Sequence, residues 1–356
     1  EPCAALSPSC PSPTWRLPLR LAGCVACCLL NGVGAATIWE VGDPQGHIET
    51  REDLPTPHEF FVKYVRGAGG PFHGVGKPVL FKGAAKKMPA FHLWTDEYLR
   101  KQHGDAIFDQ VETEKKETRM ALPKEDMKLS QFLDAYTSSS LYSVAKTPAG
   151  LADEVFLLPF MNCGGFHKRL AETVTWISSG STQSVIHSDS NQNVHCMFAG
   201  KKRWALWSPR TPLDEKEHGW VQAEEEAAAF QNAYGAFAGR IDVDAVDLDR
   251  FPGWTTFKWW NMTLDAGDCA FIPQAWFHYV EAPPLRSISV HVWFRAPKQF
   301  DQATCDKFDE HGMDPSEYLV RIGDCTWGWE PGGSGPNAKG TRCRIRKSAK
   351  RPEDEL

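Results

Sequence analysis

The sequence predicts a mostly β protein with flanking helices, in which the strands form a barrel. The strongest observation is segment 287–294, where apolar side chains alternate with small or polar ones. Successive side chains of a strand point to opposite faces, so this pattern predicts one face in the core and one toward a ligand-lined interior. Alternation in 173–177 and 202–206 predicts further strands of the same kind.

The region 47–153 precedes these strands and is predicted to mix helices and strands. Apolar residues at helical spacing predict a helix over 58–65, and Thr95 is expected to cap a second helix that starts within 93–99. The other elements expected here are strands at 77–83 and 106–111 and a helix at 128–136.

The strand-rich core is expected over 154–296, with an insertion at 210–257 that interrupts the alternation. Within the insertion, the run Glu224–Ala229 predicts a solvated helix. Residues 297–356 form a C-terminal extension without a recognisable pattern. Its segment 330–352 is rich in Gly, Pro, Lys and Arg, so we expect a mobile tail whose basic residues stay in solvent.

His187, Asp189 and His278 have the spacing of a metal site. His187 and Asp189 are two positions apart, which in an extended strand places both side chains on one face. His278 follows a turn between two predicted strands, so it can reach the same point from across a barrel. Two imidazoles and one carboxylate form the facial triad that binds non-haem Fe(II) and leaves coordination positions open. A single histidine is more often a core or surface residue, so the assignment depends on all three and their flanking sequence.

The flanking segments resemble a known family. They are Gly200–Pro209, Asp265–Phe277 and Ser287–Phe294. This ordered set resembles the JmjC branch of the cupin-like oxygenases that depend on Fe(II) and 2-oxoglutarate, above all the small protein hydroxylases built from a JmjC domain alone. The resemblance implies a double-stranded β-helix (jelly roll) with the N-terminal region packed beside the barrel. It also implies that His187, Asp189 and His278 ligate Fe(II), with 2-oxoglutarate and O₂ as cosubstrates.

The resemblance further assigns residues to the 2-oxoglutarate pocket. Lys202 lies where related hydroxylases have the lysine that pairs with the distal carboxylate of 2-oxoglutarate. Lys201 competes for this role, but strand alternation places it on the opposite face. Asn193 matches the family's asparagine near the cosubstrate or oxygen. Ser184 lies where the family often has threonine, and it keeps the hydroxyl group.

His291 departs from the family pattern, because many members have asparagine at this position. A histidine can still donate a hydrogen bond to the cosubstrate, and it can orient a neighbouring ligand. We expect it to titrate near neutral pH. His195 is close enough to Asn193 to share the pocket, and its role is left open.

Both ends of the chain predict residence in the lumen of the endoplasmic reticulum. Residues 1–36 combine a basic flank, a short apolar stretch and small residues, as a signal peptide does. Glu353–Leu356 resembles the luminal retention signal. The apolar stretch is too short and interrupted to predict a stable membrane span. A plastid or mitochondrial leader is the alternative.

Six cysteines lie beyond the leader. An even number is compatible with disulfides in an oxidising lumen. Cys196 and Cys269 lie in strand-like runs near the triad, where we expect buried free thiols. Cys305, Cys325 and Cys343 lie in the C-terminal extension, which would gain from a covalent cross-link.

The net charge of −6 is mild and gives no reason to expect nucleic-acid binding. We therefore predict an Fe(II)- and 2-oxoglutarate-dependent oxygenase that hydroxylates a side chain of a protein substrate and forms succinate. One alternative is an N-methyl-lysine demethylase, which uses the same chemistry on a methyl carbon. The other is a non-catalytic cupin-like assembly factor of the endoplasmic reticulum lumen.

Overall fold

The computed structural model of the chain describes residues 36–116, 125–211, 214–219, 234–237, 241–309, 318–326, 342–344 and 346–347. Three predicted features lie outside these residues: the signal-like leader apart from Ala36, the helix expected at Glu224–Ala229, and the retention-like Glu353–Leu356.

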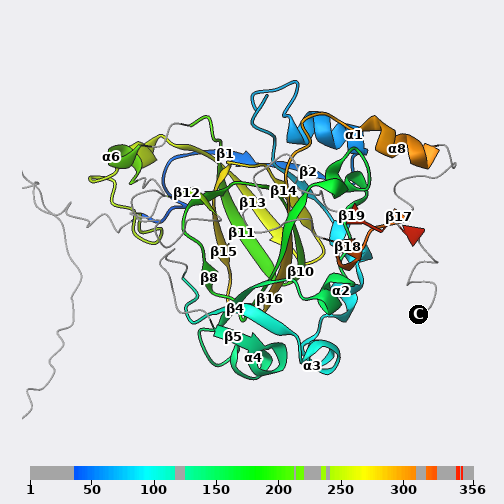
Figure 1. Cartoon of the computed structure of the whole chain (residues 1–356). Coiled ribbons are helices and arrows are strands. Elements are labelled where there is room, and N and C mark those ends of the chain that lie inside the picture. The colour runs from blue at the N-terminus through cyan, green and yellow to red at the C-terminus, as the bar shows by residue number, and fades with distance from the viewer. Residues whose placement is uncertain are drawn as a thin grey trace, which may run out of the picture. The chain divides into compact units, whose positions relative to one another are not determined.

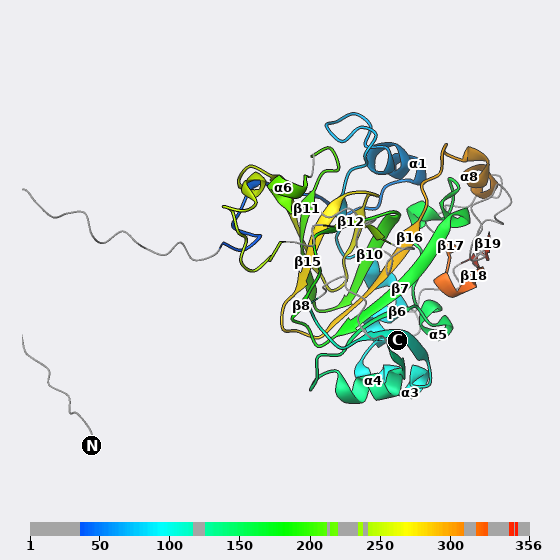
Figure 2. The same ribbon diagram turned by 60° about the vertical axis from the view of Figure 1, so that its left-hand side comes forward.

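Two β-sheets face each other and form a barrel (Figures 1 and 2). The larger sheet has the order β2 (Glu49–Arg51), β3 (Val79–Phe81), β14 (Cys269–Ile272), β10 (Gln192–Ala199), β16 (Ser287–Phe294), β7 (Leu170–Ser178), β6 (Tyr142–Lys146), β4 (Ile107–Glu112) and β5 (Glu125–Lys128). The smaller sheet has the order β1 (Asp43–His47), β13 (Lys258–Asp265), β11 (Lys201–Trp207), β15 (Phe277–Ala282), β9 (His187–Asp189) and β12 (Tyr234–Phe237), and β8 (Thr182–Gln183) pairs with β15.

The chain passes back and forth between the two sheets. β9 belongs to the smaller sheet, β10 to the larger, β11 and β13 to the smaller, β14 to the larger, β15 to the smaller and β16 to the larger. This is the path of a double-stranded β-helix, so the predicted fold class is confirmed.

β16 shows why the sequence forms this wall. Its apolar side chains belong to the main hydrophobic core on one side of the larger sheet: Ile288, Val290, Val292 and Phe294. Ser289 and His291 contact residues of the barrel interior instead. Burying each large apolar side chain contributes about 1.5–3 kcal/mol, which fixes the register that turns the polar side chains inward.

Helices pack against the larger sheet and across one end of the barrel, where α3 and α4 lie beside β4 and β5 (Figures 1 and 2). Thr95 caps α3 (Asp96–His103) as predicted, because its hydroxyl oxygen accepts a hydrogen bond from the Tyr98 N–H (3.1 Å). The helix predicted over 58–65 is present as α1 (Pro57–Glu59) followed by the π-helix η1 (Phe60–Val65). The wider turns of η1 bury four apolar side chains: Phe60, Phe61, Tyr64 and Val65.

The remaining helical elements are short. They are η2 (Ala84–Lys87), α2 (Pro89–Leu93), α4 (Leu129–Ala135), α5 (Ala149–Ala152), η3 (Pro159–Met161), η4 (Phe166–Lys168), α6 (Glu215–His218), η5 (Pro252–Thr255), α8 (Gln302–Asp309) and η7 (Ile322–Asp324). The predicted strands at 77–83 and 106–111 and the predicted helix at 128–136 are present as β3, β4 and α4.

All six cysteines beyond the leader form disulfides, which are Cys163–Cys305, Cys196–Cys269 and Cys325–Cys343. The expectation of free thiols at Cys196 and Cys269 is therefore wrong. β10 and β14 pair antiparallel with Cys196 directly opposite Cys269, so both sulfur atoms meet on the same face of the sheet.

Part of the C-terminal extension is ordered by this bonding. β18 (Cys325–Thr326) pairs with β19 (Arg342–Cys343), and β17 (Tyr318–Leu319) pairs with β20 (Arg346–Lys347). Of these strands, β19 and β20 lie in segment 330–352, and for them the expectation of a mobile tail is wrong, because a disulfide and two small sheets hold them.

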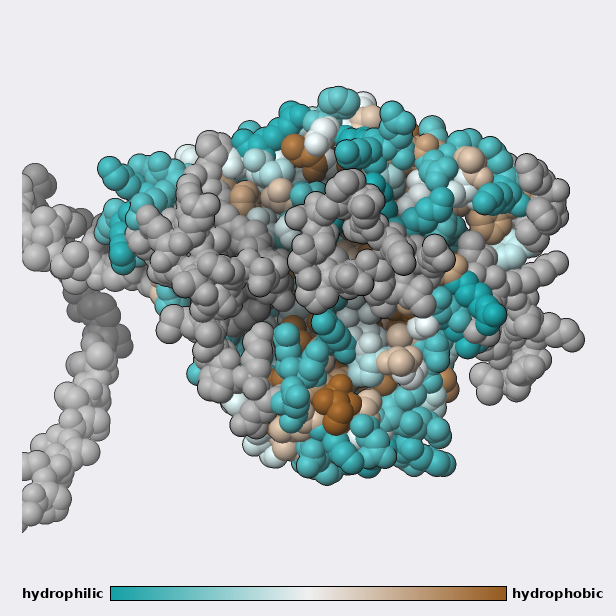
Figure 3. Space-filling view, in the orientation of Figure 1, coloured by the Kyte–Doolittle hydropathy of each residue, from teal (hydrophilic) through white to brown (hydrophobic). Residues whose placement is uncertain are grey.

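On the face shown in Figure 3, most of the described residues, which are the coloured ones, are hydrophilic. Hydrophobic residues are scattered among them. The exposed large hydrophobic residues of the described part are Val62, Leu93, Ile107 and Leu285. None of the helices in the described ranges is long and apolar enough to cross a membrane.

Candidate metal centre

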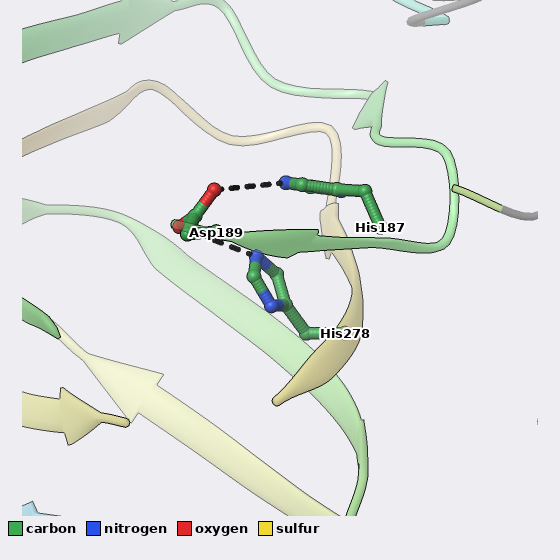
Figure 4. A group of neighbouring side chains, drawn as sticks. All are labelled: His187, Asp189 and His278. Carbon is green, nitrogen blue, oxygen red and sulfur yellow. Dashed lines mark ion pairs between the residues drawn. The ribbon is translucent and has the colours of Figure 1, made fainter. Parts of the chain in front are cut away.

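His187, Asp189 and His278 meet inside the barrel, as predicted (Figure 4). His187 and Asp189 come from β9, and His278 lies directly opposite His187 on β15. Nε2 of each histidine is 3.8 Å from a carboxylate oxygen of Asp189. One ligand atom from each residue lies within 4.8 Å of the other two, and all three side chains are buried.

Backbone carbonyls orient both imidazoles. The Nδ1–H of His187 donates to the carbonyl oxygen of Val185 (2.8 Å), and that of His278 donates to the carbonyl of Trp276 (3.0 Å). A neutral imidazole with its proton on Nδ1 keeps the Nε2 lone pair for a metal. Both Nε2 atoms face the same carboxylate, so the two lone pairs converge.

The turn before His278 is fixed to the strand that carries the other two residues. Ala275 adopts the left-handed region (φ 66°), which costs a residue with a Cβ about 1 kcal/mol or more. Its N–H donates to the Asp189 carbonyl oxygen (2.9 Å). The neighbouring Gln274 N–H donates to Oε1 of Gln192 (3.1 Å). These bonds set where β15 starts and therefore where His278 points.

The residues fit a divalent transition metal. A buried carboxylate needs a compensating positive charge, and among the described residues Asp189 forms ion pairs only with the two histidines. Histidines whose Nε2 lone pairs must bind a metal cannot also be protonated there. Two imidazole nitrogens and one carboxylate oxygen are the donor set of the facial Fe(II) triad. His187, Asp189 and His278 could therefore hold Fe(II).

Lys202 lies in the same interior, on β11. Its side chain is buried, and Nζ donates to Oγ of Ser289 (3.0 Å) and lies 5.1 Å from the ring centroid of Trp176. Lys201 points to the opposite face, where it is exposed and pairs with Asp265 (3.0 Å). The predicted difference between the two lysines is present in the structure.

Asn193 and His291 contact each other on the larger sheet. Nδ2 of Asn193 donates to Nδ1 of His291 (3.0 Å), and both side chains are buried. Burial, followed by the charge of Lys202, lowers the pKa of His291 well below its usual value. The expectation that His291 titrates near neutral pH is therefore wrong, since the buried ring stays neutral.

His195 lies directly opposite His291 on the neighbouring strand, with ring centroids 4.0 Å apart. It is fully buried, and burial is also the largest cause of the lowering of its pKa. Trp204 connects the pair to the triad, because its ring lies 5.1 Å from His195 and 5.3 Å from His278.

Ser184 lies at the edge of the smaller sheet. Its Oγ accepts a hydrogen bond from the backbone N–H of Val280 (2.9 Å), and its own N–H donates to the Val280 carbonyl (2.8 Å). The hydroxyl proton of Ser184 is still able to donate to another group.

Sequence reasoning missed the groups that surround Lys202. Ser289 and Trp176 contact its ammonium group, and Trp204 lies on the same strand face two positions along. The alternation of 287–294 places Ser289 on the polar face of that strand. The pairing of that residue with Lys202 depends on how the two sheets stack, which no local pattern encodes.

Two facing sheets that enclose a buried set of two histidines and one carboxylate define a cupin-type barrel with a candidate metal site. The chain belongs to the cupin-like domain family, whose sequence profile matches residues 71–300.

Curated relatives refine this membership. Jumonji C domain-containing protein 5 of Drosophila melanogaster is 25% identical over 260 residues, which cover 68% of this chain and 58% of that protein. Lysine-specific demethylase 8 of Xenopus tropicalis is 22% identical over 226 residues, 61% of this chain and 48% of that protein. HSPB1-associated protein 1 of Homo sapiens is 31% identical over 124 residues, 34% of this chain and 23% of that protein.

The matches to the first two relatives span about half the length of those proteins. They support the JmjC branch of the cupin-like proteins, which is in general a family of 2-oxoglutarate oxygenases that normally use Fe(II).

Proposed function

We propose that the chain is an Fe(II)- and 2-oxoglutarate-dependent oxygenase that hydroxylates a side chain of a protein. The observation that carries the proposal is one enclosed interior with a buried carboxylate between two histidines and a buried lysine. A metal needs the first group, and a distal carboxylate of a chelating 2-oxo acid needs the second.

His187, Asp189 and His278 would hold Fe(II), with the Asp189 carboxylate offsetting part of its charge. When bound, Fe(II) together with 2-oxoglutarate and O₂ supplies the oxidation that inserts a hydroxyl group into a C–H bond, while 2-oxoglutarate becomes succinate and CO₂. The Nδ1–H bonds to Val185 and Trp276 keep both imidazoles in the ligating tautomer.

Lys202 would pair with the distal carboxylate of 2-oxoglutarate and so orient the molecule toward the triad. Ser184 and Asn193 would donate hydrogen bonds to it. The rings of Trp176 and Trp204 lie beside Lys202 and His278 and would exclude water around a bound carboxylate, which would strengthen its attraction to the lysine.

A lysine demethylase is the second candidate, because one relative carries the name lysine-specific demethylase 8. The same metal and cosubstrate would act on an N-methyl carbon. Succinate formation driven by methylated histone peptides, and by no unmethylated protein, would favour the demethylase over the hydroxylase.

The proposed compartment is the lumen of the endoplasmic reticulum. Disulfides persist in oxidising compartments, and the six cysteines of residues 37–356 form three of them. Alkylation of thiols in freshly lysed cells, followed by mass spectrometry, tests this proposal. Three intact disulfides support it, and six alkylated thiols contradict it.

The experiment for the function compares two cell lines that lack the protein. One line receives the wild-type chain and the other a His187→Ala/Asp189→Ala variant, and mass spectrometry seeks peptides that gain one oxygen atom only with the wild type. Such peptides support hydroxylation. Equal complementation of every deletion phenotype by both chains would instead support the non-catalytic assembly factor.

A further inference from the structure

The interior side chains form three layers along the barrel. At one end lies the triad, where His278 is opposite Leu206. Two positions along β11 from Leu206 is Trp204, and two further is Lys202, at the other end. On the facing sheet, the pairs between β10 and β16 run in the same order: Asn193 with Trp293, His195 with His291, and Met197 with Ser289.

Contacts between the sheets align these layers. Lys202 reaches Ser289 (3.0 Å) at one end, and Trp204 touches His195 (5.1 Å) in the middle. The His195–His291 pair therefore lies between the layer of the triad and the layer of Lys202. A molecule that chelates a metal at the triad and extends to Lys202 passes this pair.

Hydrogen bonding at the pair is incomplete. Neither ring nitrogen of His195 has a hydrogen-bond partner among the described residues, although the side chain is fully buried. Oδ1 of Asn193 also has none. With Asn193 donating to Nδ1 of His291, the proton of the neutral His291 ring is on Nε2, which is a donor. The buried ring nitrogens of His195, which have no protein partner among the described residues, mark a place that a ligand or water completes.

The number of buried cations limits which ligand can bind at this pair. Among the described residues, Lys202 is the one lysine or arginine that is buried. A second, separate anion at two neutral imidazoles would have no cation to balance it. The donors of the pair are therefore matched to oxygen atoms of the same ligand that Lys202 binds.

We propose that His195 is a further cosubstrate-binding residue, whose ring donates a hydrogen bond to the keto-acid end of the cosubstrate beside His291. This inference rests on the proposed function. The distal carboxylate already has Lys202 and Ser289 as donors, whereas the carboxylate beside the keto group has an oxygen that accepts from the pair. The pair thus binds the part of the ligand that every 2-oxo acid shares, and Lys202 binds the part that only a dicarboxylate has.

Calorimetry on the full chain loaded with Mn(II), which binds without turnover, tests this division. The ligands are 2-oxoglutarate and 2-oxobutanoate, which lacks the distal carboxylate. His195→Leu should lower the affinity for both ligands by a similar factor of about ten. Lys202→Met should lower the affinity for 2-oxoglutarate alone. His195→Gln, which keeps a donor, should recover most of the affinity that His195→Leu loses.

Met197→Leu is the matched control, because Met197 is the next inward residue of β10 and forms no hydrogen bond of this kind. It should leave both affinities unchanged. If His195→Leu does not fold, His195→Phe replaces it and keeps a ring against Trp204. Mn(II) affinity should be equal in all variants, which excludes a general disturbance of the site.

Two results overturn the inference while the wild type binds both ligands. One is unchanged affinity in His195→Leu, and the other is a loss confined to 2-oxoglutarate. A wild-type protein that binds Mn(II) but neither ligand would overturn the proposed function itself and this inference with it.

Discussion

Replacing Lys202 by methionine removes the charge of the proposed 2-oxoglutarate site and little else. Nζ of Lys202 is buried, with Ser289 Oγ at 3.0 Å and the Trp176 ring at 5.1 Å. Methionine keeps an unbranched apolar side chain of similar length. The ligand-free variant should be at least as stable as the wild type, because a buried charge has been removed.

The expected loss of affinity follows from Coulomb's law and desolvation. Opposite charges about 2.8 Å apart attract by about 6 kcal/mol at an effective dielectric constant of about 20. Part of that energy offsets the removal of the carboxylate from water, and truncating one partner of a buried pair costs about 3–5 kcal/mol. A loss of about 3 kcal/mol raises the Kd of 2-oxoglutarate about 150-fold.

Lys201→Met is the control, since the neighbouring lysine is exposed and pairs with Asp265 at 3.0 Å. An exposed pair contributes about 0–1 kcal/mol to stability and does not touch the interior, so the Kd should stay within about twofold. Calorimetric titration of the Mn(II)-loaded proteins gives both values. Equal losses in the two variants, or a Lys202→Met Kd within about threefold of wild type, would refute the reasoning.

Three further predictions concern stability. Burial, followed by the charge of Lys168, lowers the pKa of His167 to about 4. The unfolded chain therefore binds more protons below about pH 6.5, and the wild type should lose up to about 3 kcal/mol by about pH 4 in urea titrations, a loss that His167→Leu should lack. Replacing Cys196 and Cys269 by alanine should cost about 4 kcal/mol in the same assay, because their disulfide closes a separation of 73 residues. Gly200→Ala should cost about 3 kcal/mol and lower Tm, because φ is +76° and the new Cβ would lie 2.2 Å from a backbone oxygen.

Each of these stability predictions has a result that contradicts it. The same pH dependence in wild type and His167→Leu would mean that His167 is not a buried neutral ring. Equal unfolding free energies with and without Cys196 and Cys269 would contradict their pairing. An unchanged Tm for Gly200→Ala would contradict the close approach of the turn to the neighbouring backbone.

The fold class and the triad could be predicted because both depend on short-range rules. The alternation of β16 determines which side chains face the core, and the two-residue spacing of His187 and Asp189 places both on one strand face. The choice of Lys202 over Lys201 follows from the same periodicity. Each of these inferences requires only that the segment forms a strand.

Features that depend on strand pairing could not be predicted. The disulfide between Cys196 and Cys269 requires the register of β10 against β14, and the contact of His195 with His291 requires that of β10 against β16. These strands are far apart in the sequence, and a shift of one residue would separate both pairs.

The lowered pKa of His291 was missed for the same kind of reason. The sequence placed His291 on the inner face of a strand but did not show how fully two sheets enclose it, and this burial is the main cause of the lowered pKa. The π-helical turn of η1 likewise reflects packing of its aromatic residues in the core, where tertiary contacts decide the winding of the backbone.

The most direct measurement is an anaerobic titration of the Fe(II)-loaded chain with 2-oxoglutarate, followed by visible absorption. Chelation of the metal by the 2-oxo acid should produce a metal-to-ligand charge-transfer band in the wild type. The band should be absent in His187→Ala and should require far more 2-oxoglutarate in Lys202→Met. A folded wild-type protein that binds Fe(II) but gives no band at saturating 2-oxoglutarate would contradict the proposed oxygenase.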